Sequence, residues 1–363
     1  MKESSLRNST VTVKVMCAIV FLVFTFCFLF FYQAESLTYL QHVLSGGRTH
    51  YDRTVGGIII IVLLVLVQHA VYGITHLSKR GHALTYFPSI LILTVLTDVT
   101  ADGHIPFHWV WLSPLLLIAF VALAWLSKQF ETYEPGQDNP GLFSRQMWIN
   151  MLTMFAMFLF ACLFSNRDEV LHNRLKAEML IQQKQYQQAS EVGKRSHETD
   201  SSLTMLRVYA LAQTGQLGSH LFEYPIVGGQ DVMQPNGTSV KPLMISPNQI
   251  RLMNKNRKTR NDCLLTKHLL ARDLDAFARD ITKIYDIDSV QLPRHYSEAL
   301  VLYTHLRSHR VLTYHDSVLD ADYEDLRKLQ RRYPDLTTRQ TAIRDTYGNT
   351  YWYYYLKTPP NLP

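Results

Sequence analysis

Long apolar runs dominate the first 165 residues of the chain and then stop. A transmembrane helix needs about 20 predominantly apolar residues, and five runs approach that length: 12–32, 55–77, 83–99, 107–126 and 146–164. The third run is the weakest, because it has 17 residues, contains Pro88 and ends next to Asp98. The fourth and fifth runs begin near tryptophans, as at a membrane surface. The pattern predicts a polytopic bundle of about five transmembrane helices in residues 1–166.

The first run also resembles a secretory signal peptide, because Lys2, Arg7 and Lys14 precede it. It is long for the apolar core of such a peptide, and no small-residue cleavage signal follows Phe31. We therefore interpret it as an uncleaved anchor.

After residue 166 the apolar positions recur at helical spacing, which predicts an all-α chain with a soluble second half. Residues 167–224 read as helical pairs in which Ala177, Leu180, Tyr186 and Ala189 have the offsets of a tetratricopeptide repeat. A generic helical hairpin would account for these residues equally well. Residues 225–261 are rich in Gly, Pro, Asn and Ser and predict a linker. Residues 262–363 return to helices.

Within residues 262–363 the spacing predicts one long helix over 262–285, a second beginning at Pro293 and another over 322–333. The chain then ends in an aromatic stretch, Tyr351 to Tyr355, which includes Trp352. Such a stretch can bind a glycan or a membrane interface. The simpler interpretation is that it docks the end of the chain on the helical core.

Charge follows the same division. Of the 36 basic and 30 acidic residues, 17 lie in residues 1–166 and 49 in residues 167–363. The mixed signs of the second half argue against a nucleic-acid partner. The four cysteines show no metal-binding or disulfide spacing, so neither a metal nor another cofactor is predicted. With a cytoplasmic N-terminus, seven basic residues fall on the inner side of the spans and two, Arg48 and Arg53, on the outer side. This bias predicts that residues after 166 lie outside the cytoplasm.

Polar residues in or near the spans are the candidates for function. His69 and His76 lie seven residues apart, which predicts that they share one face of the helix. An ionisable group within a span is a functional candidate. A neutral imidazole bonded to a neighbouring helix is the simpler interpretation. Asp98, Asp102, His104 and His108 could in principle bind a metal, but their spacing matches no known pattern.

Three stretches carry a resemblance to a known family: AQTGQLG (212–218), LPRHYSEALVLY (292–303) and TYWYYY (350–355). They resemble a family of uncharacterised membrane proteins of Bacteroidota, classed as a domain of unknown function. The resemblance implies N-terminal transmembrane helices and a helical, repeat-like C-terminal region, but no catalytic residues. It also implies a bacterial inner-membrane location and O-glycosylation within Asp-Ser-aliphatic sequences. Ser289 and Ser317 are the two candidates.

No nucleophile–base arrangement, phosphate loop or nucleotide motif occurs, so the sequence does not favour an enzyme. Stacked helices offer grooves for peptides. The sequence therefore predicts a protein-docking scaffold in the cell envelope, with the lipid bilayer and a protein as partners. The alternative is a membrane enzyme or transporter in envelope polysaccharide assembly, with the helical domain as an accessory.

Overall fold

The protein is described here from a computed structural model that covers residues 2–131, 144–196, 198–250, 257–287 and 291–357. The part of the chain that the structure describes is 74% helical, and none of these residues forms a strand. The chain divides into two compact units, Met1–Asp168 and Glu169–Pro363. The all-α fold class is confirmed.

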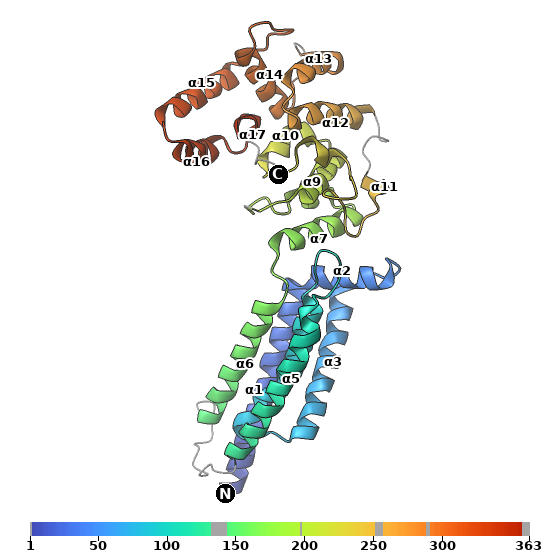
Figure 1. Cartoon of the computed structure of the whole chain (residues 1–363), viewed down its shortest axis with the longest axis vertical. Coiled ribbons are helices and arrows are strands. Elements are labelled where there is room, and N and C mark those ends of the chain that lie inside the picture. The colour runs from blue at the N-terminus through green and yellow to red at the C-terminus, as the bar shows by residue number, and fades with distance from the viewer. Residues whose placement is uncertain (1, 132–143, 197, 251–256, 288–290, 358–363) are drawn as a thin grey trace. The chain divides into compact units, whose positions relative to one another are not determined.

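Unit 1 is a bundle of long apolar helices (Figure 1). Its helices are α1 (Lys2–Cys27), continued by a π-helix, η1 (Phe28–Tyr32), then α2 (Ala34–Ser45), α3 (Arg53–Thr75), the 3-10 helix η2 (Lys79–Tyr86), α4 (Phe87–Thr97), α5 (His108–Glu131) and α6 (Arg145–Phe164). Within the described residues, four stretches are long and apolar enough to cross a membrane: Val11–Tyr32, Arg53–Thr75, His108–Gln129 and Arg145–Phe164. These four correspond to the first, second, fourth and fifth predicted spans.

The third predicted span is not a single α-helix. Its place is taken by the eight residues of η2 and the 11 residues of α4. Pro88 lies in the first turn of α4, where its missing N–H costs no helical hydrogen bond. At 1.5 Å per residue, α4 alone is about 16 Å long, roughly half the thickness of a bilayer core. The prediction of one continuous helix over 83–99 is therefore wrong.

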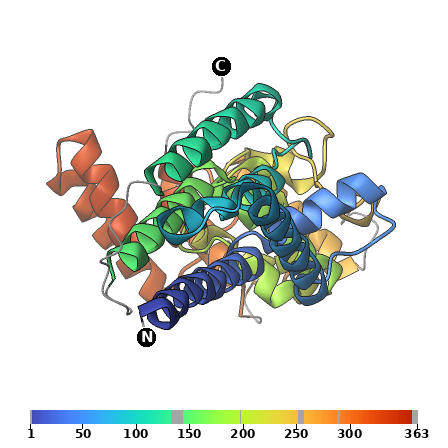
Figure 2. The same cartoon turned by 90° about the horizontal axis from the view of Figure 1, so that it is seen from below.

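The η2–α4 segment is the centre of the bundle. It packs against α1, α3, α5 and α6, and Figure 2 shows α1 (dark blue) and α5 (blue-green) on opposite sides of the bundle. Side chains of its neighbours form hydrogen bonds with two of its polar groups. Asn150 Oδ1 accepts from the Ala83 amide at 2.7 Å, and Gln68 Nε2 donates to Thr85 Oγ1 at 3.0 Å. Irregular backbone at membrane depth is tolerated where protein surrounds it in this way.

The bundle has five long segments: α1 with η1, α3, η2 with α4, α5, and α6. Their ends alternate between the two ends of the bundle (Figure 1). At one end, Lys14 Nζ donates to the Tyr72 hydroxyl at 2.5 Å. At the other end, Gln33 Nε2 donates to the Asn166 carbonyl at 3.1 Å, and the Asn166 amide donates to the Thr97 carbonyl at 3.4 Å. The chain therefore passes along the bundle five times, and it leaves unit 1 at the end opposite to Lys14.

Unit 2 is built around two helices that are buried on nearly every side. Its elements are α7 (Glu169–Gln182), α8 (Tyr186–Glu191), α9 (Ser201–Thr214), α10 (Leu217–His220), η3 (Leu221–Glu223), η4 (Gly229–Met233), α11 (Pro247–Ile250), α12 (Arg257–Leu270), α13 (Leu274–Ile284), α14 (Arg294–Leu306), α15 (Ser317–Arg332), α16 (Leu336–Tyr347) and α17 (Tyr351–Leu356). Every residue from Ser202 to Ala212 in α9 and from His295 to Thr304 in α14 is buried. The helices α7, α8, α10 and α12 pack on α9, and α10, α13, α15 and α17 pack on α14.

The predicted long helix over 262–285 is in fact two helices. The chain turns at Arg272, which adopts a left-handed conformation with φ of 58°. Asp273 then caps the start of α13 by accepting a hydrogen bond from the Ala276 amide at 2.9 Å. An aspartate cap of this kind satisfies an amide that has no partner within the helix. The break lets α13 fold back beside α12.

The aromatic C-terminal stretch docks on the core, as the simpler interpretation predicted. Tyr351 and Trp352 of α17 are buried. Both contact Glu298 of α14: the Tyr351 amide donates to Glu298 Oε2 and the Trp352 indole to the Glu298 carbonyl, each at 2.7 Å. The end of unit 2 is therefore held by hydrogen bonds as well as by aromatic packing.

Candidate functional site

The polar residues predicted in or near the spans do not form one site. His69 lies on an exposed face of α3, and its Nδ1 is 2.9 Å from the Val65 carbonyl of its own helix. His76 follows α3 in a left-handed conformation, with φ of 49°. The expectation that both histidines share one helical face is wrong, because the helix ends between them.

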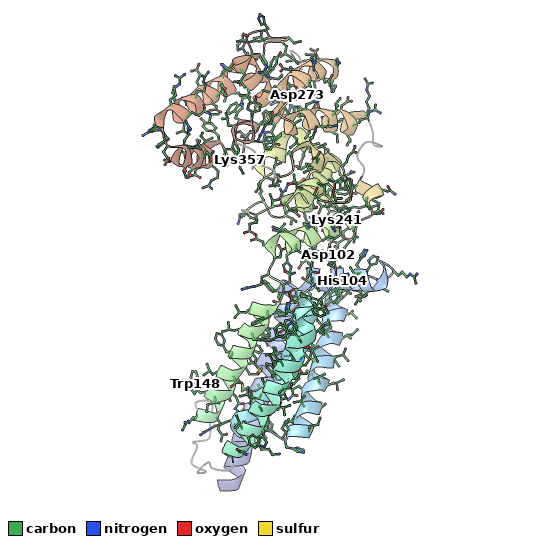
Figure 3. All side chains as sticks on the ribbon, viewed as in Figure 1. Asp102, His104, Trp148, Lys241, Asp273 and Lys357 are labelled. Carbon is green, nitrogen blue, oxygen red and sulfur yellow. The ribbon has the colours of Figure 1, made fainter. Side chains whose placement is uncertain are left out.

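The loop between α4 and α5 brings together only part of the predicted cluster. Asp98 Oδ2 accepts from the Trp109 indole at 2.8 Å and lies 3.7 Å from His108 Nε2. Asp102 and His104 are exposed, and Figure 3 shows them at the end of unit 1 that lies away from Trp148. No group of three or more potential metal ligands with metal-binding geometry occurs among the described residues. The loop therefore has a structural explanation in the contact between Asp98 and Trp109.

Of the two candidate glycosylation sites, only Ser317 lies among the described residues. Ser289 lies outside the described residues. Ser317 is exposed and is the first residue of α15, directly after Asp316, which caps the helix through the Val318 and Leu319 amides. Glycosylation of either serine stays a prediction.

A cleft in unit 2 is the better candidate for a functional site. It has a volume of about 920 Å³ and lies where α10, α12, α14 and the start of α15 meet. Pockets of 300–1,000 Å³ are typical of ligand-binding sites in proteins. Its lining mixes polar, charged and apolar side chains, among them Lys258, Asp262, Tyr285, Arg294, Ser297, Tyr314 and Leu319.

Gly218 allows the close packing that forms one wall of this cleft. A Cβ atom at this position would lie 2.6 Å from Cζ of Tyr296 and 2.9 Å from Cβ of Pro293. Only glycine lets α10 approach α14 so closely without displacing the buried Tyr296 ring. Gly218 therefore lets α10 pack directly against α14 beside the cleft.

Asp262 is the buried charged side chain of the cleft. It is only 7% exposed, and its Oδ1 accepts a hydrogen bond from the Tyr285 hydroxyl at 2.9 Å, with the Tyr296 hydroxyl at 3.5 Å. Burial raises the pKa of the Asp262 carboxyl, while the Tyr285 hydrogen bond and the charge of Lys258 oppose that rise. Shifted carboxyl pKa values of this kind, in a cleft, are typical of functional sites.

The charged groups at the mouth of the cleft are either paired elsewhere or exposed to solvent. Arg294 Nε donates to Glu298 Oε1 at 2.9 Å, and Asp316 caps α15. Lys258 is exposed, one helical turn before Asp262. Asp262 is thus the buried charge of the cleft, and the groups around the rim are solvated or already paired.

Sequence reasoning did not find Asp262. A signal was present, because Asp262 lies in the apolar stripe of α12 with Leu265, Thr266 and Leu269, all of which are buried. A lone carboxylate in such a stripe must be buried with it. What the stripe could not indicate is that α10, α14 and α15 would leave a cleft beside it.

Residues 246–358 match the model of a family described only as a family of unknown function, DUF6057. All the residues that line the cleft, apart from Gly215, Gly218 and Ser219, lie within this range. No curated protein and no solved structure matches the chain. The expected relation to an uncharacterised domain is thus supported for the second half of unit 2.

Proposed function

We propose that this chain is a membrane-anchored docking protein of the bacterial cell envelope. Unit 1 holds it in the inner membrane, and unit 2 binds an extended segment of a protein partner in the cleft between α10, α12, α14 and α15. The observation that carries the proposal is the cleft itself, because it combines apolar walls, tyrosine hydroxyls and one buried carboxylate. Backbone and side-chain groups of a peptide need this mixture of partners.

The alternative, a membrane enzyme or transporter, has less support. Its candidate residues at one end of unit 1 have local structural partners. Asp52 caps α3 through the Thr54 and Val55 amides, Arg53 pairs with Glu35 at 3.1 Å, and Asp98 accepts from Trp109. A catalytic site would require several of these groups to converge on one reacting centre.

The orientation that we propose places the N-terminus in the cytoplasm and unit 2 in the periplasm. Two features support it: the excess of basic residues at the N-terminal end of the bundle, and the five passages along the bundle. In this proposal η2 and α4 together form the third crossing. Eight residues at about 2.0 Å and 11 residues at about 1.5 Å give about 32 Å, enough for a bilayer core.

Reporter fusions at Pro363 test this topology. Alkaline phosphatase, which is active only outside the cytoplasm, is expected to be active when fused there. Green fluorescent protein at the same position is expected to be dark, because it does not fold after export through the general secretion route. A fluorescent, phosphatase-inactive pair would show an even number of crossings and would overturn the topology.

Photo-crosslinking tests the docking function in cells of the native type. Val318 lines the cleft and is 66% exposed, so p-benzoylphenylalanine at this position is expected to form an adduct with one discrete protein. Leu336 on α16 is 57% exposed but does not line the cleft, and the same probe there is the matched control. Equal adducts at both positions, or none at Val318, would contradict docking in the cleft.

A further inference from the structure

We propose that the cleft recognises a cationic side chain, a lysine or arginine of the docked segment, through the carboxylate of Asp262. This inference rests on the proposed docking function and names the chemistry that the partner must present. The ammonium or guanidinium group would enter the cleft and pair with Asp262. Its aliphatic stem would lie along the apolar lining formed by Leu292, Pro293 and Leu319.

The first argument is that Asp262 is oriented but has no counter-ion among the residues of unit 2 that the structure describes. Hydroxyl groups from two other elements, Tyr285 and Tyr296, reach its Oδ1. Tyr296 also donates to the Asp262 backbone carbonyl at 3.3 Å. None of the lysine, arginine or histidine nitrogens in the described part of unit 2 pairs with this carboxylate within 4.0 Å. Buried carboxylates are normally paired, so a cation from a ligand would complete the site.

The second argument is that burial makes the ionised form of the Asp262 carboxyl less favourable than its protonated form. Its pKa in the folded protein is raised above the ordinary value of 3.8. The folded state therefore favours the protonated form, and the resulting stability is present below the ordinary pKa and is lost as pH rises through the raised pKa. The ionised carboxylate is thus held less favourably in this cleft than in the unfolded chain. A charged group kept at such a cost in a cleft is typical of a binding role.

The third argument concerns Lys258, whose positive charge lies near the Asp262 carboxylate. Lys258 precedes Asp262 by one helical turn and is exposed at the rim. Its positive charge lowers the pKa of Asp262 without an ion pair. A cation that enters the cleft is repelled by Lys258, so removal of that charge should strengthen binding. If Lys258 were instead the structural counter-ion of Asp262, its removal would destabilise unit 2.

The test compares three variants of the full-length protein that carry p-benzoylphenylalanine at Val318. Asp262→Asn keeps an oxygen that accepts from Tyr285 but removes the charge, and the adduct yield is expected to fall at least about tenfold, as for loss of a hydrogen bond between charged groups. Lys258→Gln is expected to raise the yield. Asp316→Asn is the matched control, because it makes the same change in the same cleft at a carboxylate already used as a helix cap. Its yield should stay within about twofold.

The outcomes separate this inference from the docking function. An adduct in the wild type that Asp262→Asn leaves unchanged would overturn cation recognition and leave docking intact. A wild type without any adduct would overturn docking. In that case a direct probe decides the chemistry of the cleft: the amidated tripeptide Gly-Lys-Gly, titrated into the full-length protein in detergent micelles, with Gly-norleucine-Gly as the uncharged control. Equal binding of the two peptides would overturn the role of Asp262.

Two further measurements exclude a purely structural effect. Asp262→Asn should not lower the free energy of unfolding of unit 2 at neutral pH, because it removes an unfavourable buried charge.

Binding of Gly-Lys-Gly to the wild type should weaken as pH falls through the raised pKa of Asp262. The groups that face Asp262 are Lys258 and Cys263 on α12, Tyr285 after α13 and Tyr296 on α14. Burial raises the pKa of the Cys263 thiol and of the Tyr285 and Tyr296 hydroxyls, whose ordinary values already lie well above the carboxyl range. Binding that did not depend on pH would therefore contradict the proposal.

Discussion

Trp352→Ala is expected to destabilise unit 2 by about 3–5 kcal/mol, the usual cost of removing a large buried aromatic side chain. Trp352 is fully buried, its ring lies 5.5 Å from that of Tyr323, and its indole donates to the Glu298 carbonyl at 2.7 Å. The substitution leaves a cavity and removes the indole hydrogen bond to the central helix α14. Because a domain has only about 5–15 kcal/mol of stability in total, this loss is large.

Pulse proteolysis of the full-length protein in detergent micelles with increasing urea measures this effect, since it detects the fraction of unit 2 that is unfolded. Trp352→Phe should cost less, because it keeps most of the aromatic packing and loses only the indole hydrogen bond. Leu336→Ala, at an exposed position of α16, should change the stability by no more than about 0.5 kcal/mol. A midpoint for Trp352→Ala equal to that of Leu336→Ala would mean that α17 does not dock on α14.

Glu178→Gln is expected to destabilise unit 2 by about 2–4 kcal/mol, because hydrogen bonds to charged groups are strong and buried donors without partners are costly. Glu178 of α7 is buried, and its carboxylate accepts three backbone amides. Leu243 donates to Oε1 at 2.7 Å, while Met244 and Ile245 donate to Oε2 at 2.6 and 3.0 Å. A glutamine nitrogen cannot accept, so at least one of these amides would face another donor, whichever way the side-chain amide is turned.

Hydrogen exchange gives the sharper measurement of this change. Burial raises the pKa of the Glu178 carboxyl, and the three amides and Arg174 oppose that rise. Either protonation state of the carboxyl keeps two oxygens that can accept. The amides of residues 243–245 should therefore exchange slowly in the wild type and much faster in Glu178→Gln. Glu169→Gln, an exposed position on the same helix, is the control. Unchanged exchange at residues 243–245 would show that Glu178 does not hold this loop.

Some features of this protein could be predicted from the sequence because they depend on whether a segment lies in lipid or in water. They depend much less on which side chains pack beside that segment. A bilayer selects for about 20 apolar residues whatever packs beside them, and four of the five predicted runs are helices of that length. Helical periodicity likewise predicted helical pairs over 167–224, where α9 lies, and a helix that begins at Pro293, which is α14. α16 was missed because Ile343 is its one buried residue, so the helix has no apolar stripe to detect.

The tertiary structure alone decided the broken third segment and the cleft. In η2 the backbone departs from the α-helix, and its Ala83 amide is completed by Asn150, which is 67 residues away in the sequence. The cleft joins Gly218 on α10, Asp262 on α12 and Val318 on α15. Each of these residues is locally ordinary: a glycine in a short helix, an aspartate in an amphipathic helix and a valine after a helix cap. Their role depends on the fold, which brings residues that are far apart in the sequence to one cleft. The desolvation of Asp262 and the close approach at Gly218 are set by neighbouring side chains that local sequence patterns do not specify.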